Sequence, residues 1–249
     1  MMRNKVLTMG VNVITKPIAV DSILSYKLGG YVCVSNVHMC METYDSLEFR
    51  KIVNNADLVI PDGRPIFWAQ KLLGYKDAQQ VRGQDIMNAL CEESNQGELK
   101  IGLYGGSSND VLNQVIRSLT KTYPNISIVY SYSPPFRALT VAEDIQIIKD
   151  INSAKVDVLF VGIGCPKQER WMAEHKESLN CVMLGVGAAF DFICGSKKHA
   201  PRWMQKVGLE WLFRLVSEPK RLWKRYLKQN PRFIYHFSIQ LVKTKFSKK

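Results

Sequence analysis

The sequence lacks the features that mark membrane-spanning and exported proteins. None of its 249 residues belongs to an apolar run of about 18 or more, the length that a membrane-spanning helix needs. The best candidate, residues 233–242, is short and interrupted by polar side chains. No apolar block follows the first basic residues, as it would in a signal peptide. We therefore expect a cytoplasmic protein that meets a membrane only at its inner face.

The sequence also lacks the residue spacings of common metal sites. Its six cysteines form no C-x-x-C pair, so we expect reduced, mostly buried thiols and no structural zinc. Asp-x-Asp, the pair with which many sugar transferases hold a divalent ion, is absent as well. We predict neither a metal nor a bound cofactor.

The net charge of the whole chain is +12, and the positive charge is concentrated in its last part. Residues 197–249 hold 15 Lys and Arg and two acidic residues, and the preceding part is close to neutral. Such a tail indicates a polyanionic partner, either nucleic acid or an anionic membrane surface. Apolar residues recur in it at helical spacing, beginning with Leu209, Leu212, Phe213 and Val216. This pattern favours an interfacial helix on anionic lipid over a helix packed on the body.

Short apolar runs alternate with helical patterns along most of the chain. Strands are expected at residues 31–35, 58–60, 100–104, 126–132, 156–161 and 181–186, and helices at 46–55, 65–73, 84–91, 109–123, 140–152 and 168–178. Continuous apolar strands separated by helices are typical of a doubly wound sheet covered on both faces. We predict an α/β, Rossmann-like, mostly parallel domain over residues 1–195 and a basic, amphipathic helical appendage over residues 196–249.

Glycine turns follow two of the predicted strands, at the edge where such a sheet binds ligands. Gly105-Gly106-Ser107 leads into a helix and would cradle a phosphate with backbone N–H groups, unless it is only a tight, capped turn. Gly162-x-Gly164 lacks the third glycine of a dinucleotide fingerprint. A nicotinamide-dependent oxidoreductase is therefore only a weak alternative.

Asp62 follows another predicted strand, within a Pro-Asp-Gly turn. A carboxylate on a rigid turn there can act as a general base. The same pattern also suits a cap for the helix that begins near Pro65, and the local pattern favours this simpler interpretation. His38 and His199 are further candidate bases, although a lone histidine more often makes a structural hydrogen bond.

Four co-linear segments resemble signatures of the WecG/TagA/CpsF family of glycosyltransferases. They are NNADLVIPDG at residues 54–63, GIGCPKQE at 162–169, GAAFDFICG at 187–195 and APRWMQKVGLEWLFR at 200–214. The resemblance implies an inverting, metal-independent transferase that moves a sugar from a UDP-sugar to a polyprenyl-diphosphate-linked saccharide. It places the reaction in the synthesis of teichoic acid, capsule or exopolysaccharide.

The resemblance also implies roles for individual residues. Asp62 matches the family's base, which takes the proton of the acceptor hydroxyl, and Asn36 would lie near the reacting sugar. The appendage would close over the site, with Arg214, Arg221 and Arg225 meeting the diphosphate. The other expected substrate-binding residues are Gly63, Arg82, Gly105, Gly106, Ser107, Tyr132, Gly162, Gly164, Lys167, Gln168 and Asp191.

Two alternatives stay open. Arg64-Pro65 and Gln80 differ from the teichoic-acid members, so the transferred sugar is either N-acetylmannosamine or a hexose such as glucose. The alternative function is a nucleic-acid-binding α/β protein that uses its basic tail, which leaves the strand-end motifs unexplained. The expected partners are the UDP-sugar, the polyprenyl-diphosphate acceptor and an anionic membrane surface, without nucleic acid, and a homo-oligomer is left open.

Overall fold

A six-stranded parallel sheet forms the centre of the protein in the computed structural model, which describes residues 1–26, 29–97 and 99–246. The spatial order is β4 (Leu58–Pro61), β3 (Gly30–Ser35), β8 (Val182–Gly185), β7 (Val158–Gly162), β5 (Lys100–Gly105) and β6 (Ser127–Tyr132). Each predicted strand forms, with its ends shifted by at most two residues. The prediction of an α/β, Rossmann-like, doubly wound sheet is confirmed, and the carboxyl ends of all six strands share one edge.

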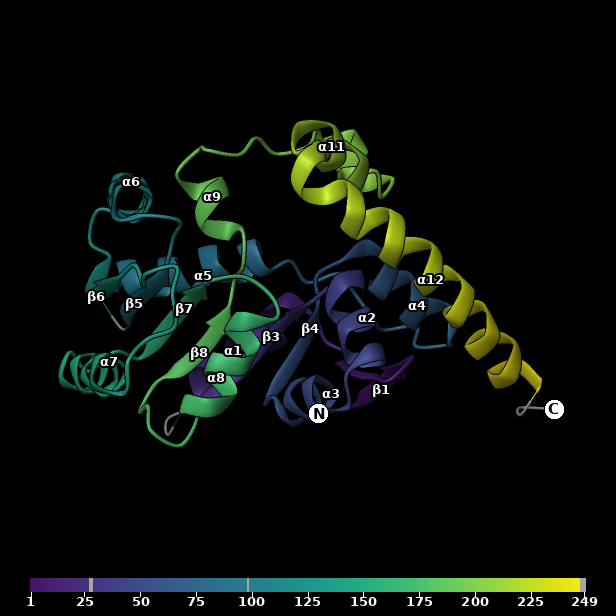
Figure 1. Cartoon of the computed structure of the whole chain (residues 1–249), viewed down its shortest axis with the longest axis horizontal. Coiled ribbons are helices and arrows are strands. Elements are labelled where there is room, and N and C mark those ends of the chain that lie inside the picture. Colours follow the sequence, from purple (N-terminus) through teal and green to yellow (C-terminus); the bar gives the residue numbers. More distant parts are fainter. Residues whose placement is uncertain (27–28, 98, 247–249) are drawn as a thin grey trace.

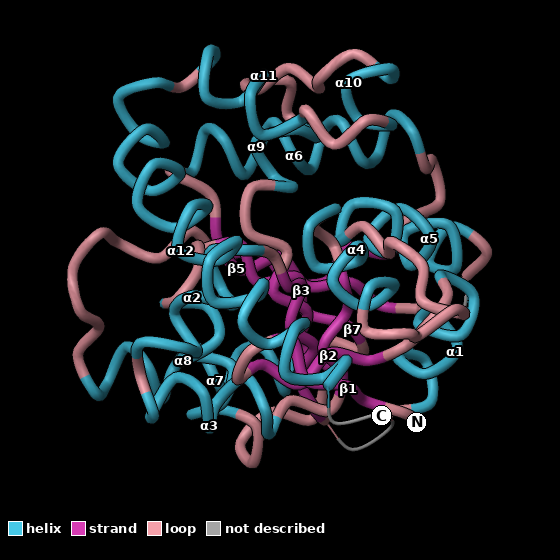
Figure 2. Tube along the Cα trace, turned by 90° about the vertical axis from the view of Figure 1, so that its right-hand side faces the viewer, coloured by secondary structure: helices cyan, strands magenta, loops and turns pink. Residues whose placement is uncertain are grey.

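Helices cover both faces of this sheet because each face presents apolar side chains that must be buried. One buried cluster joins the sheet to α2 (Val37–Asp45), α3 (Leu47–Asn55), α7 (Val141–Ser153) and α8 (Lys167–His175). The other joins it to α1 (Lys16–Ser25), α5 (Gly83–Asn95), α6 (Asn109–Thr122) and α9 (Ala189–Ile193). In Figure 2, α2, α3, α7 and α8 lie on one side of the strands and α1 and α5 on the other.

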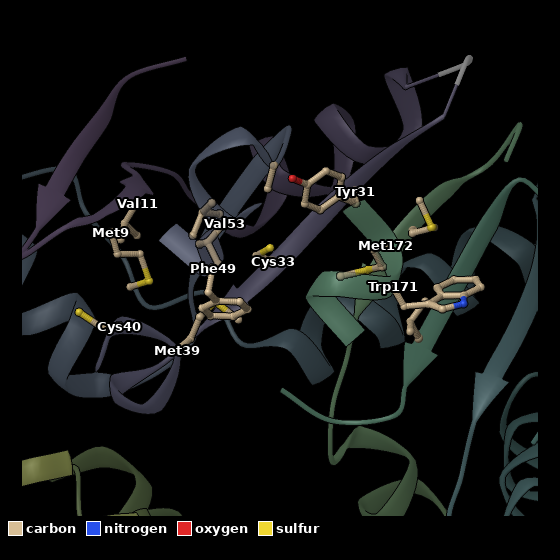
Figure 3. Close-up of a cluster of buried hydrophobic side chains, with 14 of the residues drawn as sticks. Met9, Val11, Tyr31, Cys33, Met39, Cys40, Phe49, Val53, Trp171 and Met172 are labelled. Atoms are coloured by element: carbon tan, nitrogen blue, oxygen red, sulfur yellow. The ribbon is translucent and has the colours of Figure 1, made fainter. Parts of the chain in front are cut away.

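Sulfur-containing and aromatic side chains fill the first of these clusters. Figure 3 shows Phe49 and Met39 beside Cys33 of β3, with Trp171 and Met172 of α8 farther along the sheet. All six cysteines are free thiols, four of them buried and two half-buried. This agrees with the reduced, mostly buried thiols that the sequence predicts.

An antiparallel hairpin, which the sequence analysis does not predict, precedes the sheet. Its strands are β1 (Arg3–Val6) and β2 (Met9–Asn12). Arg3 Nη1 donates to the backbone oxygen of Asn54 at 2.8 Å. Gln70 Nε2, from α4 (Arg64–Leu72), donates to Asn4 Oδ1 at 2.7 Å. Hydrogen bonds from distant parts of the chain therefore hold the hairpin to the body.

Three helices follow Gly195 in the part of the chain that the structure describes. They are α10 (Arg202–Lys206), α11 (Glu210–Ser217) and α12 (Pro219–Phe246). Figure 1 shows α11 above the sheet and α12 running from it along α2 towards the C-terminus. Considering the described ranges only, we find no helix with the length and hydropathy needed to cross a bilayer.

The far half of α12 is fixed to the body by polar and apolar contacts. Arg232 donates through both Nη atoms to the carboxylate of Asp45 on α2, at 2.9 and 2.6 Å. The Gln240 side chain accepts from the backbone N–H of Leu7 at 2.8 Å and donates to the backbone oxygen of Lys5 at 2.9 Å. Phe233 and Phe237 of the same helix are buried. This part of the C-terminal segment therefore shares the core of the α/β body.

Candidate active site

Asp62 lies at the carboxyl end of β4, where a backbone and a side-chain hydrogen bond fix it. Its backbone N–H donates to Ser35 O at 3.0 Å, which ties it to the end of β3. Its Oδ1 accepts from the backbone N–H of Gly83 at 2.8 Å. The interpretation as a cap for the helix near Pro65 is therefore wrong, because Gly63 occupies the N-cap of α4. The carboxylate instead faces the first amide of α5, and a helix N-terminus favours negative charge.

The surroundings of Asp62 make it a weaker acid than an ordinary aspartate. Burial, together with the nearby carboxylate of Glu210, raises the Asp62 pKa to about 6. The Gly83 amide and the charges of Arg82 and Arg214 act in the opposite direction. Asp62 nevertheless keeps partial solvent exposure. A carboxyl group with this pKa and this access has the properties of a general base near neutral pH.

Asn36 and Gly63 bring the ends of β3 and β4 together. Asn36 is the N-cap of α2, where its side chain accepts from the Met39 N–H at 3.1 Å. A Cβ atom at Gly63 would lie 3.3 Å from Asn36 Cα, so a side chain there would push the two turns apart. The structure thus places predicted residues Asn36, Asp62 and Gly63 side by side.

The glycine turns after β5 and β7 meet in the middle of the same edge. Gly105 has φ +143°, and a Cβ atom there would stand 2.6 Å from the backbone carbon of Gly162. Gly106 donates its N–H to Gly162 O at 3.4 Å. Ser108, rather than the exposed Ser107, caps α6 by accepting from the Val111 N–H. These contacts explain why the turn after β5 needs glycine at position 105, and they leave the Ser107 hydroxyl free of a capping role.

Gln168 is held in one orientation beside these turns. Its Oε1 accepts from the Gly164 N–H at 3.1 Å, and its Nε2 donates to Glu169 Oε1 at 2.7 Å. Glu169 is fully buried, which raises its pKa to about 7. A Cβ atom at Gly187, after β8, would lie 3.9 Å from both amide atoms of Gln168. Glu169 thus joins the site as a partner of Gln168 that the sequence analysis did not select.

Lys167 and Tyr132 stand at the margins of this arrangement. Lys167 is exposed at the start of α8. Tyr132 ends β6 and stacks on Tyr104, with ring centroids 6.1 Å apart. The structure shows no contact between either residue and Asp62. Their predicted roles in substrate binding stay predictions.

Asp191 on α9 is connected to the C-terminal helices by an ion-pair chain. Lys197 contacts the Asp191 carboxylate and lies 3.5 Å from Glu218 Oε2. Glu218 accepts in turn from Arg221 Nη2 at 2.6 Å. The sequence analysis did not select Lys197 and Glu218, because these residues approach Asp191 and Arg221 only in the folded chain. Two predicted site residues, Asp191 and Arg221, thereby belong to one network.

Arg214 and Arg225 bring positive charge to the site. The Nε atoms of both are buried and donate to no group in the part of the chain that the structure describes. The Arg214 guanidinium lies 5.7 Å from the ring centroid of Phe192. Burial lowers the Arg225 pKa, as do the charges of Arg214 and Arg221. Guanidinium groups gathered in this way favour an anion such as a diphosphate.

Arg82, predicted to bind substrate, points towards the C-terminal helices. Its Nη1 donates to Gln205 Oε1 at 2.6 Å, and its Nη2 to Glu210 Oε2 at 2.8 Å. The sequence analysis did not select Gln205 and Glu210, although both lie in the 200–214 segment that carries the resemblance. Their place in that segment is the only feature of the sequence that could have pointed to them.

The two histidines considered as bases have other surroundings. His38 Nδ1 lies 3.4 Å from Glu42 Oε1, and burial lowers its pKa to about 4, helped by the charge of Arg225. His38 is therefore neutral at physiological pH and a poor proton acceptor. His199 stacks on Phe192 with ring centroids 4.6 Å apart. Asp62, at a strand end beside the C-terminal helices, remains the candidate base.

The parallel sheet and the groups at its carboxyl edge together are typical of an α/β group-transfer enzyme. A partly exposed carboxylate, glycine turns and the guanidinium groups of Arg214 and Arg225 meet at that edge. The chain belongs to the WecG/TagA/CpsF family of glycosyl transferases, whose family model matches residues 4–247. It is accordingly a glycosyltransferase, and the family predicted from the sequence is confirmed.

Two relatives carry the same descriptive name, N-acetylglucosaminyldiphosphoundecaprenol N-acetyl-beta-D-mannosaminyltransferase. The protein of Bacillus subtilis (strain 168) is 28% identical over 205 residues, which cover 82% of this chain and 77% of the relative. The protein of Staphylococcus aureus (strain MW2) is 30% identical over 188 residues, covering 75% of this chain and 71% of the relative. The names describe transfer of N-acetylmannosamine onto a polyprenyl-diphosphate-linked sugar by those proteins.

Proposed function

We propose that the protein transfers N-acetylmannosamine, or a closely similar sugar, from a UDP-sugar to a polyprenyl-diphosphate-linked saccharide with inversion and without a metal. The observation that carries the proposal is Asp62, a partly exposed carboxyl at a strand end whose pKa is raised to about 6. The names of the relatives favour N-acetylmannosamine over the hexose alternative. The reaction would serve the synthesis of a cell-surface polysaccharide such as teichoic acid, capsule or exopolysaccharide.

The proposed step is a single displacement at the anomeric carbon. Asp62 accepts the proton of the acceptor hydroxyl while that oxygen forms its bond to the sugar. The bond between the anomeric carbon and the UDP oxygen breaks on the opposite face, so the configuration inverts. The electron pair leaves with UDP, and the proton stays on the Asp62 carboxyl until solvent removes it.

Arginine side chains would take the role that a divalent ion has in many other transferases. Arg214 and Arg225 each have a buried Nε without a partner among the described residues, and Arg221 lies in the same cluster. Guanidinium groups bind phosphate oxygens in a fork that matches their geometry. The Gly105–Gly106 turn, Gln168 and Asp191 would line the donor side of the pocket. In this proposal no metal is required to stabilise the leaving diphosphate.

The C-terminal segment would also bring the enzyme to its lipid-linked acceptor. Val216 of α11 is 74% exposed, and Trp223 and Leu227 of α12 are exposed as well. No residue of α11 is buried, although the helix is strongly amphipathic. An unburied apolar face beside many basic residues suits the surface of an anionic membrane. We propose a peripheral location on the inner face of the cell membrane.

Replacement of the base tests the proposal most simply. Asp62→Asn should reduce transfer by about 10²–10⁴-fold, the usual contribution of a general base. Binding of UDP should change by only a few-fold, since the base contacts the acceptor. Asp21→Asn, which alters an exposed carboxylate on α1, is the matched control and should keep full activity. Activity of Asp62→Asn within a few-fold of the wild type would exclude this role.

The identity of the donor sugar needs a separate experiment. UDP release should be compared for UDP-N-acetylmannosamine, UDP-N-acetylglucosamine and UDP-glucose, with a short-chain N-acetylglucosaminyl-diphospholipid as acceptor. The proposal predicts the fastest release from UDP-N-acetylmannosamine, and only in the presence of acceptor. Faster acceptor-dependent release from UDP-glucose would assign the chain to the hexose alternative instead.

A further inference from the structure

A four-residue stretch, called here the 80–83 segment, holds the Asp62 turn from one side. Gln80 Nε2 donates to the backbone oxygen of Asp62 at 2.6 Å. The Val81 N–H donates to Pro61 O at 2.9 Å, and the Gly83 N–H donates to Asp62 Oδ1 at 2.8 Å. Three residues of the segment thus contact the candidate base or its neighbour. A shift of this segment would move the carboxylate with it.

The remaining residue of the segment, Arg82, makes its contacts with the C-terminal helices. Its guanidinium donates to Gln205 Oε1 at 2.6 Å and to Glu210 Oε2 at 2.8 Å. Gln205 is itself fixed, because its Nε2 donates to Ala200 O at 2.6 Å and its backbone oxygen accepts from Arg64 Nε at 3.1 Å. A second contact from the body therefore reaches the same residue of α10.

The packing beneath the segment leaves it little freedom to move alone. A Cβ atom at Gly83 would stand 2.7 Å from Val34 Cγ1, so the backbone of Gly83 presses directly on β3. Val81 is buried. The Arg82 and Glu210 side chains are only 28% and 31% exposed, so their ion pair is partly shielded from solvent. Pairs in such surroundings are screened less by salt than pairs on an open surface.

We propose that Glu210 and Gln205 are positioning residues, which act through Arg82 to couple the docking of α10 and α11 to the placement of Asp62. The inference rests on the proposed role of Asp62 as the base. In this arrangement the C-terminal helices set the orientation and the basicity of a group that they do not themselves touch through a hydrogen bond. The base would be fully competent only while those helices are docked.

The charges around Asp62 make the coupling measurable. The charged groups that act on its carboxyl are Glu210 and Arg214 of α11 and Arg82 of the 80–83 segment. The Glu210 carboxylate raises the Asp62 pKa, and the two arginines lower it. Loss of the Glu210 charge, with both arginines still in place, lowers the Asp62 pKa. A purely structural role for the ion pair predicts lower activity without any change in the titration of Asp62.

The test compares Glu210→Gln with the wild type across pH 5 to 8, using the transfer assay and NMR titration of the Asp62 carboxyl. The Asp62 pKa should move from about 6 towards the ordinary aspartate value of 3.8. The kcat/KM of the variant should fall by about tenfold or more at pH 7 through misplacement of the base. The ratio of its kcat/KM to that of the wild type should be several times higher at pH 5 than at pH 7, because more of its base stays ionised at pH 5. Glu210→Asp, which keeps the charge, should retain most of the wild-type profile.

Glu218→Gln is the matched control, since it removes a carboxylate of the same C-terminal segment that pairs with Lys197 and Arg221 instead. It should leave the Asp62 titration unchanged. If the Asp62 pKa in Glu210→Gln equals that of the wild type, the proposed coupling is wrong. It is also wrong if Glu218→Gln shifts the Asp62 pKa as much as Glu210→Gln does. The NMR titration does not depend on catalysis. An active Asp62→Asn enzyme would therefore refute the proposed base while the titration still reported on the coupling.

Discussion

Removal of one buried aromatic ring from α12 should destabilise the whole protein. Phe237 is 7% exposed and stacks on Phe233, with ring centroids 5.7 Å apart and an interplanar angle of 4°. Phe-to-Ala substitutions in cores cost about 3–5 kcal/mol of unfolding free energy. Phe237 keeps some exposure, so we expect a value at the low end of this range, about 3 kcal/mol, for Phe237→Ala. For a chain of this size that corresponds to a fall in Tm of about 6–12 °C.

The matched control is Tyr235→Ala, which removes an aromatic ring of the same helix that is 64% exposed. Its effect should stay within about 0.5 kcal/mol. Urea unfolding followed by far-UV circular dichroism and by tryptophan fluorescence measures both variants. A single transition that shifts for Phe237→Ala alone would show that the far half of α12 folds with the α/β body. Separate transitions, with that of the body unshifted, would refute this reasoning and support an independent appendage.

Two further substitutions probe the glycine turns and the exposed face of α11. Gly105→Ala should cost at least about 2 kcal/mol of unfolding free energy, because φ +143° and the nearby Gly162 backbone both oppose a side chain. Gly97→Ala, at φ +91° with open space around it, should lower the unfolding free energy by less. Equal losses of unfolding free energy in the two variants would show that the Gly162 backbone does not restrict position 105. Val216→Asp should weaken binding to phosphatidylserine vesicles about tenfold or more in a sedimentation assay. Val141→Asp, at a similarly exposed valine of α7, should leave vesicle binding unchanged. If both substitutions weakened binding equally, α11 would not be the membrane-binding surface.

The sheet was predictable because each of its strands is a short apolar run that can be recognised in the sequence. Continuous apolar runs such as residues 158–161 are buried on both faces, and the helices between them leave few alternative topologies. The hairpin of β1 and β2 was not predictable in the same way. Its strands are four residues long, and side chains of Asn54 and Gln70, remote in sequence, complete its hydrogen bonds.

The candidate site was predictable as far as it depends on strand ends. Parallel strands bring their carboxyl ends together, so Asn36, Asp62 and Gly162 could be assigned to one edge from the sequence. The partners of Arg82 could not be assigned in this way, because Gln205 and Glu210 lie more than 120 residues away and approach only through the docking of α10 and α11. The orientation of Gln168 by Glu169 likewise depends on burial that the motif does not display.

The pH dependence of kcat/KM for the wild-type enzyme tests the central role of Asp62 most directly. A base must be ionised to accept a proton, so activity should be low below the Asp62 pKa and rise with pH, with a midpoint of about 6. Asp62→Asn should lose both this limb and most of the activity. A wild-type profile that is flat between pH 5 and 8, or an Asp62→Asn profile with the same rise, would contradict the account.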